Sequence, residues 1–270
     1  MEYIAYLLFA LCSPQTLHPV NPPPSIASAH AVAVAQPVVH ANTGSGDPGE
    51  LGRLIFEDSL KNLYNTIGLA SYQLSYEVFR LGMIGYYSLR QHGRIGDKNL
   101  LSIIDFTKAS TQKRFYTIDL DELKVIFNTY VAHGKNTGEN MATSFSNVLH
   151  SNQSSLGFYV TGETYVGSKG YSLKLDGVEP GYNDNMRERA VVMHHADYVS
   201  EKWIQRYGRI GRSQGCPALP EEIAKQVIDT IKHQTAIFAY YNDATYLQTS
   251  AYLNVDRMLL EGNLSASLQP

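Results

Sequence analysis

The hydrophobic pattern changes character near Leu100, and this change is the strongest constraint on the fold. Residues 51–93 place apolar side chains at mixed three- and four-residue steps, which predicts helices with a break at Gly68. From Leu100 the apolar runs become short and are separated by polar turns, which predicts strands at 101–106, 114–120 and 124–131. We therefore expect a mainly β domain with flanking helices.

The C-terminal half continues this β-rich pattern. Glycine punctuation between residues 157 and 177 is consistent with a hairpin-rich sheet, and apolar runs at 189–194 and 236–241 predict further strands. Residues 198–207 indicate a short helix. A clear helix is expected to begin at Pro220, because proline suits the first helical turn and the next two residues are acidic.

The first 50 residues differ in composition from the rest. Residues 4–12 form an apolar run that is too short to span a bilayer but long enough for the core of a signal peptide. We interpret residues 1–29 as a signal segment rather than a buried strand. Residues 30–50 are rich in Pro and Ala and are interpreted as a linker, since such a segment cannot bury enough apolar surface to offset its chain entropy. Residues 244–270 are interpreted as a C-terminal tail.

Charge and composition limit the classes of partner. A net charge of −3 and 44% hydrophobic residues fit an ordinary globular domain and give no electrostatic case for binding nucleic acid or an anionic membrane surface. We expect an exported, periplasmic or cell-envelope protein that meets the membrane only through an N-terminal signal or anchor.

Cys216 lies in the loop Gly-Arg-Ser-Gln-Gly-Cys-Pro-Ala-Leu-Pro at residues 211–220. The sequence has only one other cysteine, Cys12, which belongs to the apolar N-terminal run. If that run is removed, the remaining thiol has no partner for a disulfide. Core cysteines usually sit inside apolar runs, whereas this one is displayed on a polar glycine-rich turn, as a reactive thiol must be.

A nucleophilic thiol needs a base, and two histidines end an apolar strand upstream of the loop. Only one of His194 and His195 can point toward the loop, because side chains alternate along a strand. Ser213 could hydrogen-bond within the turn or to the base.

Two further features of the loop bear on the reaction. The charge of Arg212 would lower the pKa of the thiol or hold a substrate carboxylate. The backbone N–H groups of Gly215 and Cys216 could point at a developing oxyanion.

Other chemistries have less support. A His near a Cys is often coincidence in an arbitrary chain. The pair of histidines lacks the spacing of a metal site, so no metal or cofactor is expected. A serine nucleophile is weaker still, since no Gly-x-Ser-x-Gly motif occurs.

Several blocks of the sequence resemble a known family. Ser213-Gln-Gly-Cys, with a histidine upstream at a strand end, resembles the signature of the L,D-transpeptidase (YkuD-like) catalytic domain. The similarity spans about residues 100–243 and is closer to a murein L,D-transpeptidase subfamily of exported bacterial proteins. It includes the blocks Val131-Ala-His-Gly-Lys-Asn-Thr-Gly, Ser154-Ser-Leu-Gly-Phe-Tyr, Thr161-Gly-Glu-Thr-Tyr and Arg189-Ala-Val-Val-Met-His-His-Ala-Asp-Tyr-Val-Ser.

The resemblance implies a fold and a reaction. The fold is a β-sandwich with the cysteine loop at the mouth of a cleft, preceded by a helical segment. Cys216 would attack the carbonyl of residue three of a peptidoglycan stem peptide, with His194 as base. The thioester would pass to an amine of a neighbouring stem and form a 3-3 crosslink. Water as acceptor would give an L,D-carboxypeptidase. Two other functions are considered: an amidase or endopeptidase that acts on wall peptides, and a non-catalytic protein that binds the wall.

Two departures from the family pattern concern the site itself. Pro217 and Ala218 follow the cysteine where the family places other residues, and His195 stands where a glycine is expected after the base. Further candidates for contact with the stem peptide are Arg212, His195, Tyr198, His133 and Tyr165. His133 also fits a strand-end histidine that is hydrogen-bonded in its turn.

Overall fold

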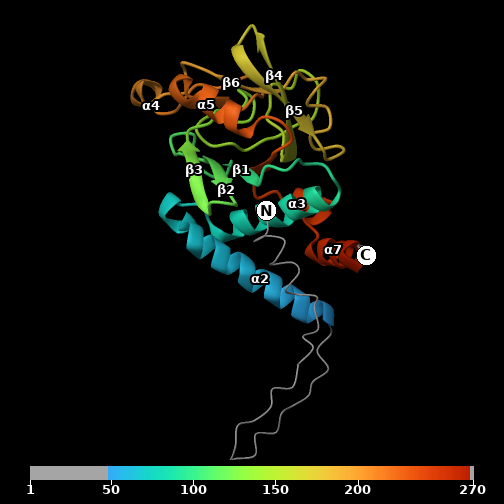
Figure 1. Ribbon diagram of the computed structural model, residues 1–270. Coiled ribbons are helices and arrows are strands. Elements are labelled where there is room, and N and C mark those ends of the chain that lie inside the picture. Colours follow the sequence, from blue (N-terminus) through green and yellow to red (C-terminus); the bar gives the residue numbers. More distant parts are fainter. Residues whose placement is uncertain (1–47, 268–270) are drawn as a thin grey trace, which may run out of the picture.

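The computed structural model describes residues 48–267 (Figure 1). The expected signal segment and most of the expected linker lie outside the described residues. The helices are α2 (Pro48–Ile67), the 3-10 helix η1 (Leu69–Tyr72), α3 (Tyr76–Gln91), α4 (Glu201–Tyr207), α5 (Glu221–Ile231), α6 (Ala244–Thr249) and α7 (Val255–Ser267). The strands are β1 (Leu100–Asp105), β2 (Phe115–Asp119), β3 (Lys124–Thr129), β4 (Gly157–Gly167), β5 (Gly170–Gly177), β6 (Val192–His195), β7 (Ala218–Leu219) and β8 (Ala236–Tyr240).

The helical N-terminal segment forms as the hydrophobic spacing predicts. Gly68 separates α2 from η1 in the left-handed conformation (φ 72°), which glycine adopts without strain. Ser75 caps α3, because its hydroxyl accepts a hydrogen bond from the backbone N–H of Val78. Among the described residues, no helix is long and apolar enough to cross a bilayer.

The strands form one mixed sheet in the order β3-β2-β1-β8-β4-β5-β6-β7. The sheet curls, because strands from both ends contribute to one core: Phe115 and Phe127 lie in the same apolar cluster as Leu173 and Met193. The chain beyond β3 then reaches the opposite end of the sheet, where Ala132 donates its N–H to the carbonyl of Ala218 at 2.9 Å. The expected β-rich domain is confirmed, and its single sheet is nearly closed on itself.

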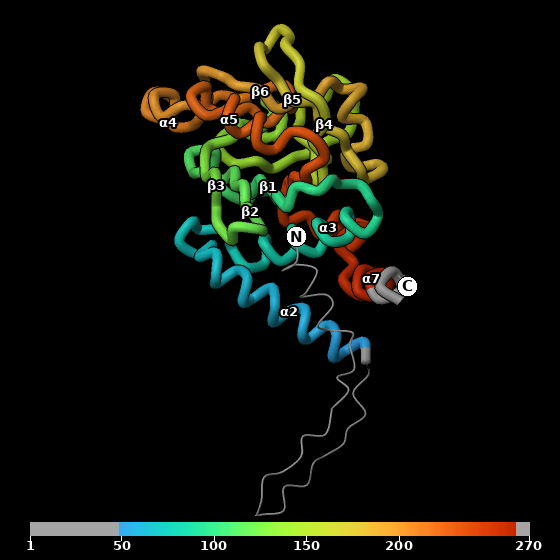
Figure 2. Tube along the Cα trace, viewed as in Figure 1, coloured from blue at the N-terminus to red at the C-terminus, as the bar shows by residue number. Residues whose placement is uncertain are grey.

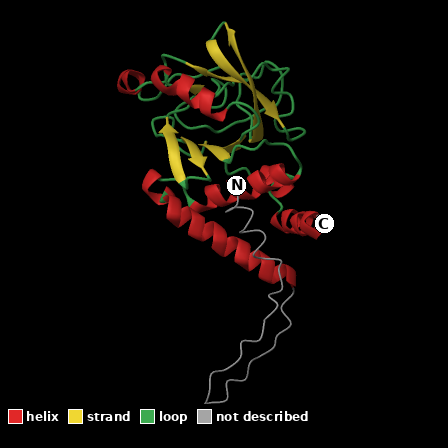
Figure 3. Cartoon of the chain, in the orientation of Figure 1, coloured by secondary structure: helices red, strands yellow, loops and turns green. Residues whose placement is uncertain are grey.

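Helices cover the outside of this sheet. Figure 3 shows α2, α3 and α7 on one side of the strands, and Figure 2 shows the β4–β5 hairpin projecting at the other end of the molecule. The helix α3 approaches the sheet closely at Gly85, where a Cβ would lie 1.9 Å from the ring of Phe158. The C-terminal segment packs here as well, since α7 contacts both α2 and α3. The sequence patterns predicted no helix in that segment.

A buried carboxylate joins the C-terminal helices to the sheet. Glu179 is 3% exposed and accepts hydrogen bonds from the N–H of Phe158 at 2.6 Å and the hydroxyl of Tyr246 at 2.9 Å. The Ser250 hydroxyl donates to the same carboxylate. Burial raises the pKa of Glu179. Glu179 is therefore part of the core.

One predicted strand begins later than expected. The structure places Arg189 and Ala190 in a turn, and β6 runs from Val192 to His195. Ala190 has a positive φ of 51°, which a strand cannot contain. The carbonyl oxygen of Ala190 in this turn lies 3.8 Å from the sulfur of Cys216.

Candidate active site

The loop that carries Cys216 is held in one conformation by its own backbone and by the chain beyond β3. Ser213 accepts a hydrogen bond from the N–H of Gly215 at 3.0 Å and donates its hydroxyl proton to the carbonyl of Cys216 at 2.6 Å. The Ser213 N–H donates to the carbonyl of His133 at 2.9 Å. Gly215 has φ 122°, and a Cβ there would lie 2.8 Å from the carbonyl oxygen of Gln153. Only glycine fits this position, so the loop is fixed where the sequence predicts a flexible turn.

The Cys216 thiol is half-buried against the backbone of the turn that precedes β6. Its sulfur accepts from the N–H of Val192 at 3.5 Å and lies 3.8 Å from the carbonyl oxygen of Ala190. Burial raises the pKa of the thiol, while the Val192 N–H and the charges of Arg189 and Lys169 oppose this. The net shift is upward, so the resting thiol is protonated at neutral pH.

His194 is 3% exposed and has one ring nitrogen committed. Its Nδ1 lies 2.7 Å from the carbonyl oxygen of His195, which can only accept, so Nδ1 carries the proton and Nε2 keeps its lone pair. No residue between 48 and 267 makes a hydrogen bond to that Nε2. Burial lowers the pKa of His194, and the nearby charge of Lys169 lowers it further, so the ring is neutral.

Strand register brings His194 close to the cysteine loop. In the parallel pair of β6 with β7, His194 is opposite Ala218, two residues beyond Cys216. The hydrogen bonds of the thiol go to backbone atoms, and no hydrogen bond joins the thiol to the imidazole within the described part of the chain. Such contacts are often long without substrate and tighten in the complex.

His195 points to the other side of the sheet, as strand alternation predicts for one of the pair. It is opposite Leu219, which belongs to the core beneath α5, and its Nδ1 lies 3.3 Å from Glu221 Oε1 at the start of α5. Its ring also stands next to Gly170, where a Cβ would lie 2.7 Å from Nε2. The arrangement therefore favours His194 over His195 as the partner of Cys216.

Three groups that the sequence suggested for the site make hydrogen bonds to other parts of the protein. His133 is 1% exposed and cannot line a cleft: Arg114 donates to its Nδ1 at 2.7 Å, and its Nε2 donates to the carbonyl of Gly138 at 3.2 Å. Burial and the Arg114 charge lower the pKa of His133 to about 3. This is the alternative considered for His133, a histidine hydrogen-bonded in its turn.

Arg212 is the second of these groups, and its role as a contact for the stem peptide stays a prediction. Its Nη1 donates to the carbonyls of Lys135 and Gly138, both at 3.0 Å, and to Glu139 Oε1 at 2.7 Å. The guanidinium thus clamps the 135–139 turn, and the cations that act on the thiol are Arg189 and Lys169. The third group is the N–H of Gly215, which donates to the Ser213 hydroxyl in this structure.

The two tyrosines lie on the face that also carries His194. Tyr198 packs against Gly211, and burial together with the ionised form of Cys216 raises the pKa of its hydroxyl to about 12. Tyr165 is 37% exposed, and the ladder Tyr165–Ser172–His194 across β4, β5 and β6 puts it in the same row as His194. Residues opposite each other in a sheet share a face.

Sequence reasoning missed Arg189 and Lys169. Arg189 opens the block that resembles the family, but no local pattern marks its side chain as a neighbour of the thiol. Lys169 lies in the turn between β4 and β5, and the pairing of β5 with β6, which places Ser172 opposite His194, brings that turn near the site. No group of three or more His, Cys, Asp or Glu residues within 48–267 is arranged to hold a metal ion.

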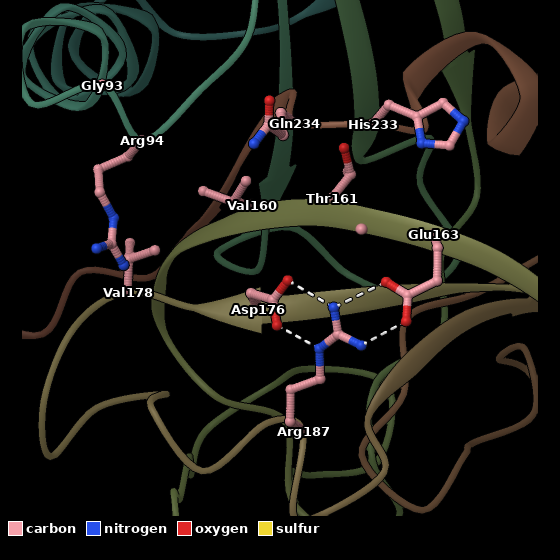
Figure 4. Close-up of a pocket in the computed structure, with 11 residues that line it drawn as sticks. Gly93, Arg94, Val160, Thr161, Glu163, Asp176, Val178, Arg187, His233 and Gln234 are labelled. Atoms are coloured by element: carbon pink, nitrogen blue, oxygen red, sulfur yellow. Dashed lines mark hydrogen bonds and ion pairs between the residues drawn. The ribbon is translucent and has the colours of Figure 1, made fainter.

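A separate open cavity of about 670 Å³ lies along β4 and contains neither Cys216 nor His194 (Figure 4). Arg187 bridges two carboxylates in its wall, with Nη1 2.9 Å from Glu163 Oε1 and Nη2 2.8 Å from Asp176 Oδ2. This network ties the turn before β6 to the β4–β5 hairpin. Nothing in the cavity resembles a nucleophile with a base.

A known family of protein domains matches the chain. The family model is described as an L,D-transpeptidase catalytic domain, and it matches residues 70–240, from η1 to the end of β8. A comparison with curated proteins finds no match.

Solved structures of proteins with this activity in their descriptions are similar at low identity. An L,D-transpeptidase from Mycobacterium smegmatis is 14% identical with a TM-score of 0.33, covering 53% of this chain and 59% of that one. An L,D-transpeptidase from Enterococcus faecium is 15% identical (TM-score 0.30; 54% and 50% covered), and one from Stackebrandtia nassauensis is 15% identical (TM-score 0.32; 69% and 78% covered). The chain therefore spans 59% of the length of the Mycobacterium smegmatis structure.

Proposed function

The chain belongs to the family of L,D-transpeptidase catalytic domains, and from this we propose that it transfers peptidoglycan stem peptides through a thioester on Cys216. One observation supports the site most directly. A protonated thiol lies on a fixed loop, and the strand paired with the end of that loop carries a buried neutral histidine whose Nδ1 is held by a backbone carbonyl and whose Nε2 has no hydrogen-bond partner among residues 48–267. That is the arrangement of a nucleophile with a base and an orienting group.

In the first half of the proposed reaction, His194 Nε2 accepts the thiol proton as Cys216 Sγ attacks the carbonyl of residue three of the stem. The tetrahedral intermediate collapses, the C–N bond to the terminal D-alanine breaks, and the leaving amine takes the proton from His194. The product is a thioester on Cys216 and a free D-alanine.

In the second half, an amine of a neighbouring stem attacks the thioester. His194 accepts a proton from that amine and returns one to the departing Cys216 sulfur, which restores the resting pair. The new amide bond is a 3-3 crosslink. With water in place of the amine, the same steps would release a tripeptide stem.

Two donors near the sulfur suit the oxyanion that forms in each half. Because the Gly215 N–H is engaged by Ser213, the Cys216 N–H is the backbone donor we assign to this role. The Tyr198 hydroxyl is the second, since its raised pKa keeps it protonated over the working pH range.

The pKa directions of the pair point to a mechanism in which the substrate triggers ionisation. Burial raises the pKa of the thiol and lowers that of the imidazole, so the neutral thiol–imidazole pair is favoured over an ion pair. The proton then moves as the sulfur attacks. Activity should persist below pH 6.5, because His194 stays neutral there, and should decline only below its lowered pKa.

The test is product analysis with the full chain. The wild type should release D-alanine from a purified tetrapeptide stem, form a crosslinked product when an amine acceptor is added, and give a covalent adduct with a carbapenem. C216A should do none of these while binding to sacculi is unchanged. Crosslinking that survives in C216A would overturn the proposal.

The alternatives separate in the same experiment. Release of D-alanine without any crosslink indicates a carboxypeptidase, and cleavage elsewhere in the stem indicates an amidase or endopeptidase. Binding to sacculi by both proteins with no change in the stems indicates a wall-binding protein. We also propose export to the cell envelope, where this substrate lies, and fractionation of cells would test it.

A further inference from the structure

The sulfur of Cys216 rests on a turn whose backbone is unusual. Ala190 adopts a left-handed conformation, with φ 51°, that costs energy for any residue with a Cβ. This conformation turns its carbonyl toward the thiol, while Val192 directs its N–H at the same sulfur. Strain of this kind persists only where the surroundings hold it, and Arg189, the residue before, anchors this part of the turn.

Arg189 is fixed by four hydrogen bonds to the loop that precedes β4. Its Nη1 donates to the carbonyl of Ser146 at 2.7 Å and to the hydroxyl of Ser155 at 2.6 Å. Its Nη2 donates to the carbonyl of Gln153 at 2.6 Å and to the hydroxyl of Ser151 at 3.2 Å. On its other side, Nη2 would be 3.5 Å from a Cβ at Gly215, so the guanidinium lies between that loop and the cysteine loop.

The charge of Arg189 is not neutralised by a carboxylate. All four acceptors are uncharged, and no ion pair involves Arg189 in the described part of the chain. Arg187 offers a contrast two residues earlier, because its guanidinium is bound to Glu163 and Asp176 in the separate cavity (Figure 4). One turn therefore carries two arginines, of which one is paired with carboxylates and the other lies beside the cysteine loop without such a pair.

We propose that Arg189 is a positioning residue that stabilises the negative charge forming on Cys216 and holds the 146–155 loop against the site. An uncompensated cation in a partly desolvated position interacts strongly with a nearby thiolate. The other titratable groups around the thiol are Lys169 from the β4–β5 turn and Tyr198 beyond β6, with the neutral His194 on the strand paired with Ala218. Of the two cations, only Arg189 is fixed by side-chain hydrogen bonds to other residues of the 48–267 segment.

The inference rests on the proposed function only in treating the thiol as a nucleophile, and it can be tested without turnover. The experiment measures the rate of alkylation of Cys216 by iodoacetamide from pH 5 to pH 11, with mass spectrometry of the Cys216 peptide to exclude Cys12. In R189Q we expect the midpoint of the profile to rise by about one pH unit, which lowers the rate at pH 7 about tenfold.

Two variants serve as controls, one for the charge at residue 189 and one for the position of the arginine in the turn. R189K should keep most of the wild-type profile, since the charge remains, and R187Q should leave it unchanged, since Arg187 is already paired. A profile of R189Q that superimposes on the wild type would overturn the inference, as would an equal shift in R187Q. If crosslinking proves independent of Cys216, these profiles still report on Arg189.

A second variant covers the case in which R189Q does not fold. Ser151 is half-buried with its hydroxyl 3.2 Å from Nη2, so S151E would place a carboxylate against the guanidinium without removing it. S151E should shift the alkylation profile upward as R189Q does, and S151Q should not. Equal profiles for S151E, S151Q and the wild type would show that the charge of Arg189 does not reach the thiol.

Discussion

His133 and His194 are both imidazoles buried close to the cysteine loop, and burial lowers the pKa of both, but their ring nitrogens are used differently. His133 accepts a hydrogen bond from Arg114 through Nδ1 and donates one to the carbonyl of Gly138 through Nε2, so both ring nitrogens are hydrogen-bonded. His194 donates through Nδ1 to the carbonyl of His195, and its Nε2 has no partner among residues 48–267.

The difference shows what separates a structural histidine from a candidate base. Burial and a lowered pKa are common to both, so neither property identifies the working residue. What distinguishes His194 is the second nitrogen, which is oriented by the first and free to take a proton. The imidazole of His133 instead accepts a hydrogen bond from the buried Arg114, and burial lowers the pKa of this arginine to about 9.

The largest expected effect is on the rate of reaction in H194Q. Removing the base while keeping a polar side chain should lower the rate of acyl transfer by roughly 10²–10⁴-fold, the usual contribution of a general base. The midpoint of urea unfolding should change little, since the side chain makes only one hydrogen bond. Rapid acylation of H194Q by a stem peptide would contradict the comparison.

H133Q should show the opposite pattern. Glutamine cannot satisfy both the Arg114 donor and the Gly138 carbonyl at this geometry, and a buried polar group left without a partner costs on the order of 2–3 kcal/mol of unfolding free energy. The folded fraction should still be acylated at Cys216. Urea titration gives the first quantity and the carbapenem adduct gives the second, with H194Q as the matched variant in both.

The stability of the wild type should fall in acid, and His133 contributes to this decline. Its pKa is about 3 in the folded protein and near 6.5 when unfolded, so the unfolded chain binds a proton that the folded chain refuses between these values. Stability is thus fully present above pH 6.5 and declines on acidification, by at most about 1.4 kcal/mol per pH unit from this group. Urea midpoints from pH 7 to pH 4 should decline less steeply in H133Q.

The sequence predicts most of the elements but not how they meet. Local signals identify the helices up to α5, and the short apolar runs identify β1, β2 and β3, but the segment interpreted as a tail forms α6 and α7. The position of β8 in the middle of the sheet, between β1 and β4, has no local signal, since its pairing joins segments that lie far apart in the chain. The near closure of the sheet between Ala132 and Ala218 is hidden for the same reason.

The candidate site can likewise be predicted from the sequence only where the signal is local. Cys216 and His194 stand out because a glycine turn and a strand end are visible in the sequence. Arg212 is the arginine nearest to the cysteine in the chain, but Arg189 is the one beside it in space. His133 also precedes a glycine turn, but it lies beyond the end of β3 at Thr129, and its hydrogen bond with Arg114 depends on the pairing of β2 with β3. Residue type and local pattern therefore suggest candidate residues for the site. The fold then determines which of these side chains are engaged by other residues.

The smallest expected effect is in H195G, which restores the glycine that the family pattern places after the base. The His195 side chain is 40% exposed, and its contact with Glu221 is a surface interaction that contributes at most about 1 kcal/mol. Its backbone carbonyl, which orients His194, is retained in the variant. We expect the specificity constant kcat/KM to change by less than about threefold, the equivalent of under 1 kcal/mol in the transition state. A loss of kcat/KM as large as that expected for H194Q would indicate that His195 is the base. It would also show that a ring nitrogen without a hydrogen-bond partner does not identify the base in this protein.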